Sequence, residues 1–205
     1  MLELPHHATL LIIDVQNGFD DPCWGARNNP DAEHNIRQLL EHWRRTGRPV
    51  IHVRHASRSP SSPLRPGQRG FDIKDEVCPA SGEPVIEKSV NSAFIGTDLE
   101  AMLRSRGVTT LVLAGLTTPH CVSTTARMAG NLGFETYVVS DATAAVQANA
   151  DFGWRGPDAR PLVDPELIHL LSLATLHGEF ATVVDTAALL QAAPLDRARV
   201  TGVRS

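Results

Sequence analysis

The chain has little of what nucleic-acid-binding, membrane-spanning or secreted proteins need. Among 205 residues, Lys and Arg number 19 against 23 Asp and Glu, a formal net charge of −4. Because phosphate recognition needs a clustered basic surface, this balance argues against a nucleic-acid partner. No apolar run approaches the ~20 residues that span a bilayer, and the opening segment MLELPHHATL has no basic stretch followed by an apolar one. We therefore expect a cytoplasmic protein with no membrane partner.

Cysteine is also scarce. The three cysteines, Cys23, Cys78 and Cys121, are an odd number and lack the paired spacing of a zinc site or a disulfide framework. Reduced thiols are therefore expected. Cys23 and Cys78 stand beside prolines in predicted loops, where nothing indicates a role for them.

The order of apolar and amphipathic segments indicates the fold class. Composition is that of a globular protein, and we expect one domain over residues 1–205 with its core at about 8–190 and a flexible tail at 195–205. Short apolar runs alternate with helical periodicity, which is typical of an α/β fold with a mainly parallel, six-stranded sheet. The predicted strands are Thr9–Asp14, Pro49–Arg54, Val85–Lys88, Thr110–Ala114, Glu135–Ser140 and Ala181–Asp185, and the predicted helices are Ala32–Arg45, Thr97–Arg106, Cys121–Leu132 and Pro165–His177.

Three of these segments place a reactive side chain at the end of a strand or the start of a helix. Asp14 and Lys88 close two apolar runs, and Cys121 opens the helix that follows a third. Ligands bind at the carboxyl edge of parallel sheets, so the three are expected to converge. A helix N-terminus favours thiolate over thiol, which predicts a lowered pKa for Cys121.

These side chains suit hydrolysis of an amide, a lactam or a similar acyl compound. Cys121 is the predicted nucleophile, Asp14 the proton relay and Lys88 the charge support. Backbone N–H groups of Thr117 and Cys121 are expected to hold the oxyanion. Two long loops are also predicted, Ala56–Pro79 and Ala148–Pro161. Candidate substrate-binding residues lie near the ends of the segments that carry Asp14, Lys88 and Cys121, or in or beside these loops; they are Phe19, Trp24, His55, Phe94, Thr118, His120 and Trp154.

Three arginines and one histidine lie in or near these predicted strands and loops. Arg54, Arg65 and Arg69 have the guanidinium fork that binds a substrate carboxylate, although solvated loop arginines are commoner. His52 falls inside a predicted strand and is expected to pack in the core.

The motifs LLIIDVQNGF, VIEKSVNSAFIGTDLE and LVLAGLTTPHCVSTTARMAGNLGFETYVVSDATAA, in this order, resemble those of the isochorismatase-like cysteine hydrolases. The resemblance covers about residues 8–190. It implies a Rossmann-like three-layer sandwich with helices on both faces and a catalytic set of Asp14, Lys88 and Cys121. It also implies a cis peptide bond between Leu116 and Thr117, and a homo-oligomer, dimer or tetramer.

One departure from the family bears on cofactors. Nicotinamidases of this family carry a metal-binding Asp-x-His, whereas this chain reads VIHVRHAS at residues 50–57, with no aspartate. We therefore expect no metal and no cofactor, only a small-molecule substrate. The segment from Arg54 to Phe94 looks like that of a metal-free subgroup that includes streptothricin hydrolase-like proteins.

Three functions remain open at this point. The first is a hydrolase of a C–N bond in an amide, lactam or carbamoyl compound, acting through a Cys121 thioester. The second is an isochorismatase-type vinyl-ether hydrolase that uses Asp14 as an acid and needs no thiol. The third is a non-catalytic redox or binding protein in which Cys121 is reversibly oxidised.

Overall fold

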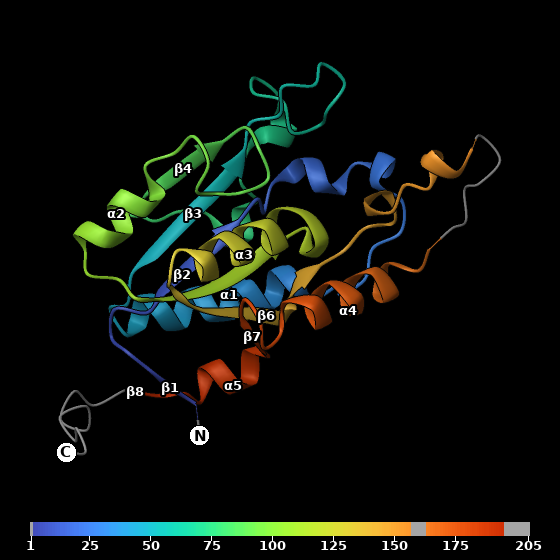
Figure 1. Ribbon diagram of the computed structural model, residues 1–205. Helices are drawn as coiled ribbons and strands as arrows, with labels where there is room; N and C mark the ends of the chain where they lie inside the picture. The colour runs from blue at the N-terminus through green and yellow to red at the C-terminus, as the bar shows by residue number, and fades with distance from the viewer. Residues whose placement is uncertain (1, 157–162, 195–205) are drawn as a thin grey trace.

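A six-stranded, all-parallel sheet forms the centre of the computed structural model, which describes residues 2–156 and 163–194 (Figure 1). The strand order is β4-β3-β2-β5-β6-β7, which confirms the predicted α/β fold. The strands are β2 (Thr9–Ile13), β3 (Val50–His55), β4 (Val85–Lys88), β5 (Thr110–Leu116), β6 (Glu135–Ala144) and β7 (Thr182–Val184). A separate parallel pair joins β1 (Glu3–Leu4) to β8 (Ala193–Pro194).

Helices cover both faces of the sheet. Their bounds are α1 (Ala32–Arg45), α2 (Leu99–Ser105), α3 (Ser123–Asn131), α4 (Pro165–Leu176) and α5 (Thr186–Leu190). One buried cluster joins the sheet to α2, α3 and α4, and a second joins it to α1 and α5. In Figure 1, α3 and α1 accordingly lie on opposite sides of the strands.

The central strand β2 shows why the sheet is covered on both faces. All five of its residues are buried. Leu11 and Ile13 contribute to the cluster with α2, α3 and α4, whereas Leu10 and Ile12 contribute to the one with α1 and α5. A continuous apolar run is what a parallel strand between two helical layers requires.

The structure alters some predicted boundaries. The helix expected from Cys121 begins at Ser123 instead, after a π-helical turn over Thr118–Val122. The backbone N–H of Val122 donates to the carbonyl oxygen of Thr117 at 3.2 Å, a bond that spans five residues. Cys121 therefore lies in an irregular turn rather than at a regular helix N-terminus.

A close approach of two strands explains one glycine. Gly115 in β5 has φ +128°, and a Cβ there would collide with the carbonyl oxygen of Ile13. Only glycine lets β5 lie this close to the end of β2. The contact fixes the position at which the chain leaves both strands for the site described below.

Some expectations concern segments that the structure treats only in part. The predicted loop Ala56–Pro79 contains two short 3₁₀ turns, Arg69–Phe71 and Asp75–Val77. The predicted loop Ala148–Pro161 is described only to residue 156, and the predicted tail Leu195–Ser205 lies outside the described residues. Among the helices that the structure describes, none has the length and apolarity needed to cross a membrane.

Candidate active site

The carboxyl ends of neighbouring strands bring four reactive side chains together. Asp14 directly follows β2, His55 ends β3, Lys88 ends β4, and Cys121 lies in the turn after β5. These strands are adjacent in the order β4-β3-β2-β5. The sequence predicted the convergence of Asp14, Lys88 and Cys121, and the structure shows these three side chains clustered.

Lys88 is the hub of the cluster. Its Nζ lies 2.5 Å from Oδ2 of Asp14, 3.3 Å from Sγ of Cys121 and 3.0 Å from Nδ1 of His55. The side chains of Asp14 and Lys88 have no exposed surface. One ammonium group therefore contacts the acid, the thiol and the imidazole at once.

The backbone at Asp14 is unusual. This residue has φ 53°, in the left-handed region, and its N–H donates to the carbonyl oxygen of Val53 at 2.9 Å. The Oδ1 atom of its carboxylate is buried without a hydrogen-bond partner among the described residues. An unpaired buried carboxylate oxygen is costly, and it is available to accept a proton.

Burial raises the pKa of the Cys121 thiol, and the nearby negative charge of Asp14 raises it further. The predicted lowering is therefore wrong. A regular helix N-terminus lowers the pKa of a thiol, whereas Cys121 is 7% exposed within a π-helical turn. The resting form is consequently the thiol.

A proton transfer within the cluster would remove this obstacle. Burial also raises the pKa of the Asp14 carboxyl, against the lowering effect of Lys88. Passing the thiol proton to Asp14, whose carboxylate lies within 4.8 Å of Sγ, leaves the total charge of the cluster unchanged. The Lys88 ammonium then pairs with the thiolate instead of the carboxylate, so no uncompensated charge is buried.

His55 completes the environment of Lys88. Burial and the Lys88 charge lower the pKa of His55, so the neutral ring accepts a hydrogen bond from Nζ. The Gln16 side chain holds the His55 backbone, accepting from its N–H at 2.8 Å and donating to its carbonyl oxygen at 3.2 Å. Sequence reasoning missed Gln16, although it lies in the DVQNGF motif.

Asp14, His55 and Cys121 are also a donor set that metals use, since one ligand atom from each lies within 4.8 Å of the others. The Lys88 ammonium, however, hydrogen-bonds to all three residues. A metal ion at this point would have to displace Lys88 or meet its positive charge. The arrangement does not fit a metal while Lys88 is in place, and the absence of a metal stays a prediction.

Above the thiol lies a pocket of about 150 Å³. Phe19, Trp24, His55 and His120, four of the predicted substrate-binding residues, line it together with Thr117 and Cys121. The remaining lining residues were not predicted from the sequence; they are Ser57, Ser62, Leu64, Asn91 and Asn149. Ser57, Ser62 and Leu64 belong to the long predicted loop Ala56–Pro79. The composition of that segment predicts a loop but does not indicate which of its side chains face the pocket.

Contacts among the lining residues order this pocket. The rings of Phe19 and Trp24 lie 5.1 Å apart, and Nε1 of Trp24 donates to the carbonyl oxygen of Gly18. On the opposite wall, Nδ2 of Asn149 donates to Oγ1 of Thr117 at 3.0 Å and lies 3.2 Å from Nδ1 of His120. The Leu116–Thr117 peptide bond, which precedes this wall, is cis. The role of the backbone N–H groups of Thr117 and Cys121 in binding an oxyanion stays a prediction.

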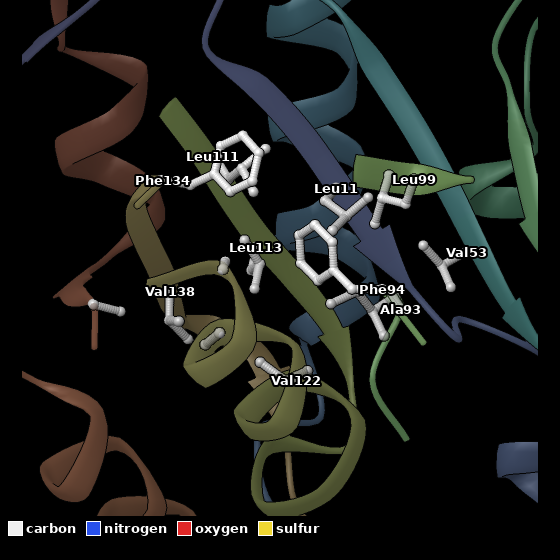
Figure 2. Packing of buried hydrophobic residues seen from close by; sticks show 14 of the residues in the cluster. Leu11, Val53, Ala93, Phe94, Leu99, Leu111, Leu113, Val122, Phe134 and Val138 are labelled. Atoms are coloured by element: carbon white, nitrogen blue, oxygen red, sulfur yellow. The ribbon is translucent and has the colours of Figure 1, made fainter. Parts of the chain in front are cut away.

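Three predicted substrate-binding residues lie elsewhere. Phe94 packs in the core, its ring 5.9 Å from that of Phe134, and Figure 2 shows it between Leu11 and Ala93. Thr118 is fully buried and hydrogen-bonds to His169 at 2.8 Å. Trp154 is 80% exposed and does not line the described pocket. Proximity to a motif in sequence did not indicate which face of the turn each side chain occupies.

The arginines offered as carboxylate ligands also lie outside the pocket. Arg54 stacks on Phe71 and pairs with Glu87 at 3.1 Å, while Arg65 and Arg69 are exposed. His52 is buried as predicted, with Nε2 2.9 Å from Glu83.

The raised pKa of Asp14 predicts the pH below which the alkylation rate of Cys121 falls. Asp14 accepts the thiol proton only as carboxylate, so the alkylation rate falls as the pH drops through its pKa. We expect the half-maximal rate above about pH 3.9, the ordinary aspartate value, and below about 8.5, that of a free thiol. Iodoacetamide alkylation of Cys121, followed by peptide mass spectrometry across pH, measures this limit. A rate that rises only near pH 8.5 or above would show that Asp14 does not assist.

Comparisons with known proteins identify the family and the fold. The Isochorismatase domain model matches residues 8–188. The isochorismatase family protein YrdC of Bacillus subtilis is 52% identical over 181 residues, 88% of this chain and 93% of its own. A crystal structure of an isochorismatase-family protein from Chromobacterium violaceum superposes with a TM-score of 0.85 at 44% identity, covering 93% of this chain and 95% of that one.

Two relatives with named activities are more distant. Streptothricin hydrolase of Streptomyces noursei is 33% identical over 138 residues, 66% of this chain and 49% of its own length. Ureidoacrylate amidohydrolase RutB of Enterobacter is 29% identical over 178 residues, 87% of this chain and 67% of its own. The predicted likeness to the streptothricin hydrolase subgroup is thus a distant one. The domain match over most of the chain, the shared fold and the clustered Asp14, Lys88 and Cys121 together show that this protein is a hydrolase of the isochorismatase family.

Proposed function

We propose that the protein is a cysteine amidohydrolase that cleaves a C–N bond of a small molecule. The observation that carries the proposal is the position of the Lys88 ammonium, in contact with both the Asp14 carboxylate and the Cys121 thiol. This arrangement lets a proton leave the thiol without burying a net charge. The amidohydrolase activity in the name of a relative, RutB, supports the same chemistry.

The reaction begins at the thiol. Sγ of Cys121 attacks the substrate carbonyl carbon while its proton passes to Asp14, and the carbonyl oxygen becomes an oxyanion near the backbone N–H groups of Thr117 and Cys121. The C–N bond then breaks, and Asp14 returns the proton to the leaving nitrogen. Lys88 pairs with the Asp14 carboxylate at rest and lies beside Sγ as the proton leaves it; once the S–C bond has formed, the negative charge is on the oxyanion.

Water completes the cycle. It attacks the thioester carbonyl and gives a proton to Asp14, forming a second tetrahedral intermediate. The C–S bond breaks, the carboxylic acid leaves, and the thiolate regains its proton from Asp14. The products are the acid and the amine or ammonia, and the site returns to its resting charge.

A turnover screen tests this function. Purified protein is offered amides, lactams, ureides and N-carbamoyl compounds, and ammonia release and product masses are recorded beside Cys121→Ala and after treatment with a chelator. We expect Cys121-dependent turnover that the chelator does not change. Turnover of a vinyl ether that persists in Cys121→Ala would overturn the proposal, as would reversible thiol oxidation with no hydrolysis. The small-molecule substrate, the homo-oligomer and the cytoplasmic location stay predictions.

A further inference from the structure

The described residues that line the pocket at Cys121 supply no net charge to attract an ionic substrate. Of its lining residues, only His55, His120 and Cys121 can ionise. Desolvation lowers the pKa of both histidines, and burial keeps the thiol protonated. Beneath them, the Lys88 charge is matched by Asp14 at 2.5 Å. At neutral pH the described walls are therefore uncharged and the ion pair below is balanced.

The charged residues of the loop that carries Ser57 and Ser62 do not line this pocket. Arg58 and Arg65 belong to the same loop as Ser57 and Ser62, but they are exposed and do not line the cavity. The neighbouring open groove is lined by Asp20 and Asp21 as well as Arg69, so its described charges do not favour an anion. A carboxylate entering the pocket would lose hydration without gaining a described cationic partner, which is costly.

The pocket does offer neutral hydrogen-bonding groups. Oδ1 of Asn91, a hydrogen-bond acceptor, lines the pocket and lies 3.8 Å from Sγ. Ser57, Ser62 and Asn149 add hydroxyl and amide groups, while Phe19 and Leu64 supply apolar wall. The pocket volume is about 150 Å³, which is roughly five times the ~30 Å³ that one water molecule occupies in the liquid. The part of the substrate that enters the pocket is therefore small.

We propose that this pocket takes a small, uncharged carbonyl compound with a free N–H group, such as a neutral amide or ureide, and rejects the carboxylate analogue of the same size. As the statement of a substrate class, this rests on the proposed amidohydrolase function. The discrimination itself belongs to the pocket, and it is measurable at Cys121 without any turnover.

Iodoacetamide and iodoacetate form a matched pair for this measurement, because they differ in an amide against a carboxylate. Each alkylates the thiol by forming an S–C bond and releasing iodide, while the thiol proton passes to Asp14. Second-order rates at Cys121 are measured by intact-mass spectrometry in a Cys23→Ser, Cys78→Ser background, since both of these thiols are exposed. N-acetylcysteine methylamide in the same solution corrects for the intrinsic reactivity of each reagent.

We expect the corrected preference for iodoacetamide to be about tenfold or more. A Ser62→Arg variant places a cation at the partly exposed wall and should raise the iodoacetate rate by about fivefold or more, whereas Ser62→Gln adds length without charge and should not. Equal corrected rates for both reagents, or a preference for iodoacetate, would overturn the proposal. Circular dichroism of each variant confirms that it is folded.

Turnover then separates this inference from the proposed function. Malonamide and malonamate have equal numbers of non-hydrogen atoms and differ at one end, a neutral amide against a carboxylate; rates are expressed per hydrolysable amide, since malonamide has two. Hydrolysis of malonamide at least about tenfold faster supports both proposals, whereas faster hydrolysis of malonamate retains the amidohydrolase and overturns the neutral pocket. Selective alkylation by iodoacetamide without hydrolysis of any amide supports the neutral pocket and counts against the amidohydrolase.

Discussion

Cys121→Ser and Cys121→Ala are expected to lower kcat/KM by about 10³-fold or more while leaving the protein folded. Of the three side chains in contact with Lys88, the Cys121 thiol is the one assigned as nucleophile, and a serine hydroxyl is far harder to deprotonate in the same buried position. Either change removes or replaces a single atom in a position that is 7% exposed, so the loss of stability should be about 1 kcal/mol. Steady-state kinetics and thermal unfolding measure the two effects separately.

A matched control and a direct view of the intermediate complete this test. Cys78→Ser changes an exposed thiol in the same way and should leave kcat/KM unchanged. Acid quenching of the wild-type reaction followed by intact-mass spectrometry should show an acyl adduct on Cys121, and both Cys121 variants should lack it. Turnover of Cys121→Ser within about twofold of wild type would exclude the thioester route.

Lys88→Met is expected to cost about 3–5 kcal/mol of unfolding free energy at neutral pH as well as most of the activity. The variant leaves the Asp14 carboxylate buried without its partner, and an uncompensated buried charge is more costly than a missing ion pair. The pKa of Asp14, already raised by burial, should rise further without the Lys88 charge. Urea unfolding monitored by circular dichroism measures the loss.

The sign of the pH dependence follows from linkage. A folded-state pKa above the unfolded value means that the folded protein binds more protons, so it gains stability relative to the unfolded chain as the pH falls. The deficit of Lys88→Met should therefore be largest above the raised Asp14 pKa and should shrink at acidic pH. A deficit that is constant with pH would show that lost packing, rather than the unpaired carboxylate, is responsible.

Two further variants separate stability from catalysis. Asp14→Asn combined with Lys88→Met removes both charges and should recover much of the lost stability with no recovery of activity. Lys74→Met is a matched control, because Lys74 is also buried and pairs with Asp20 and Glu33 outside the pocket. It should lose stability but retain kcat/KM in the folded fraction.

Local sequence pattern determined the architecture of this protein. The apolar run at residues 9–13 is long enough for one strand and too uniform for a half-exposed one, which predicts a parallel strand between helical layers, as β2 is. The helix α1 has the predicted bounds, Ala32–Arg45, because amphipathic periodicity is a property of neighbouring residues. The positions of Asp14, Lys88 and Cys121 followed from the same logic, since parallel strands end at one edge.

Only the tertiary structure decided the state and surroundings of those side chains. The Cys121 pKa is raised because residues distant in sequence bury the thiol and place a carboxylate beside it. Phe94 was assigned to the pocket and lies in the core, while Asn91, three residues earlier, lines the pocket. A strand or helix can be predicted from the spacing of a few neighbouring residues. The burial of a side chain, its protonation and its direction in a turn depend instead on contacts between residues that are distant in sequence, and only the folded chain brings those residues together.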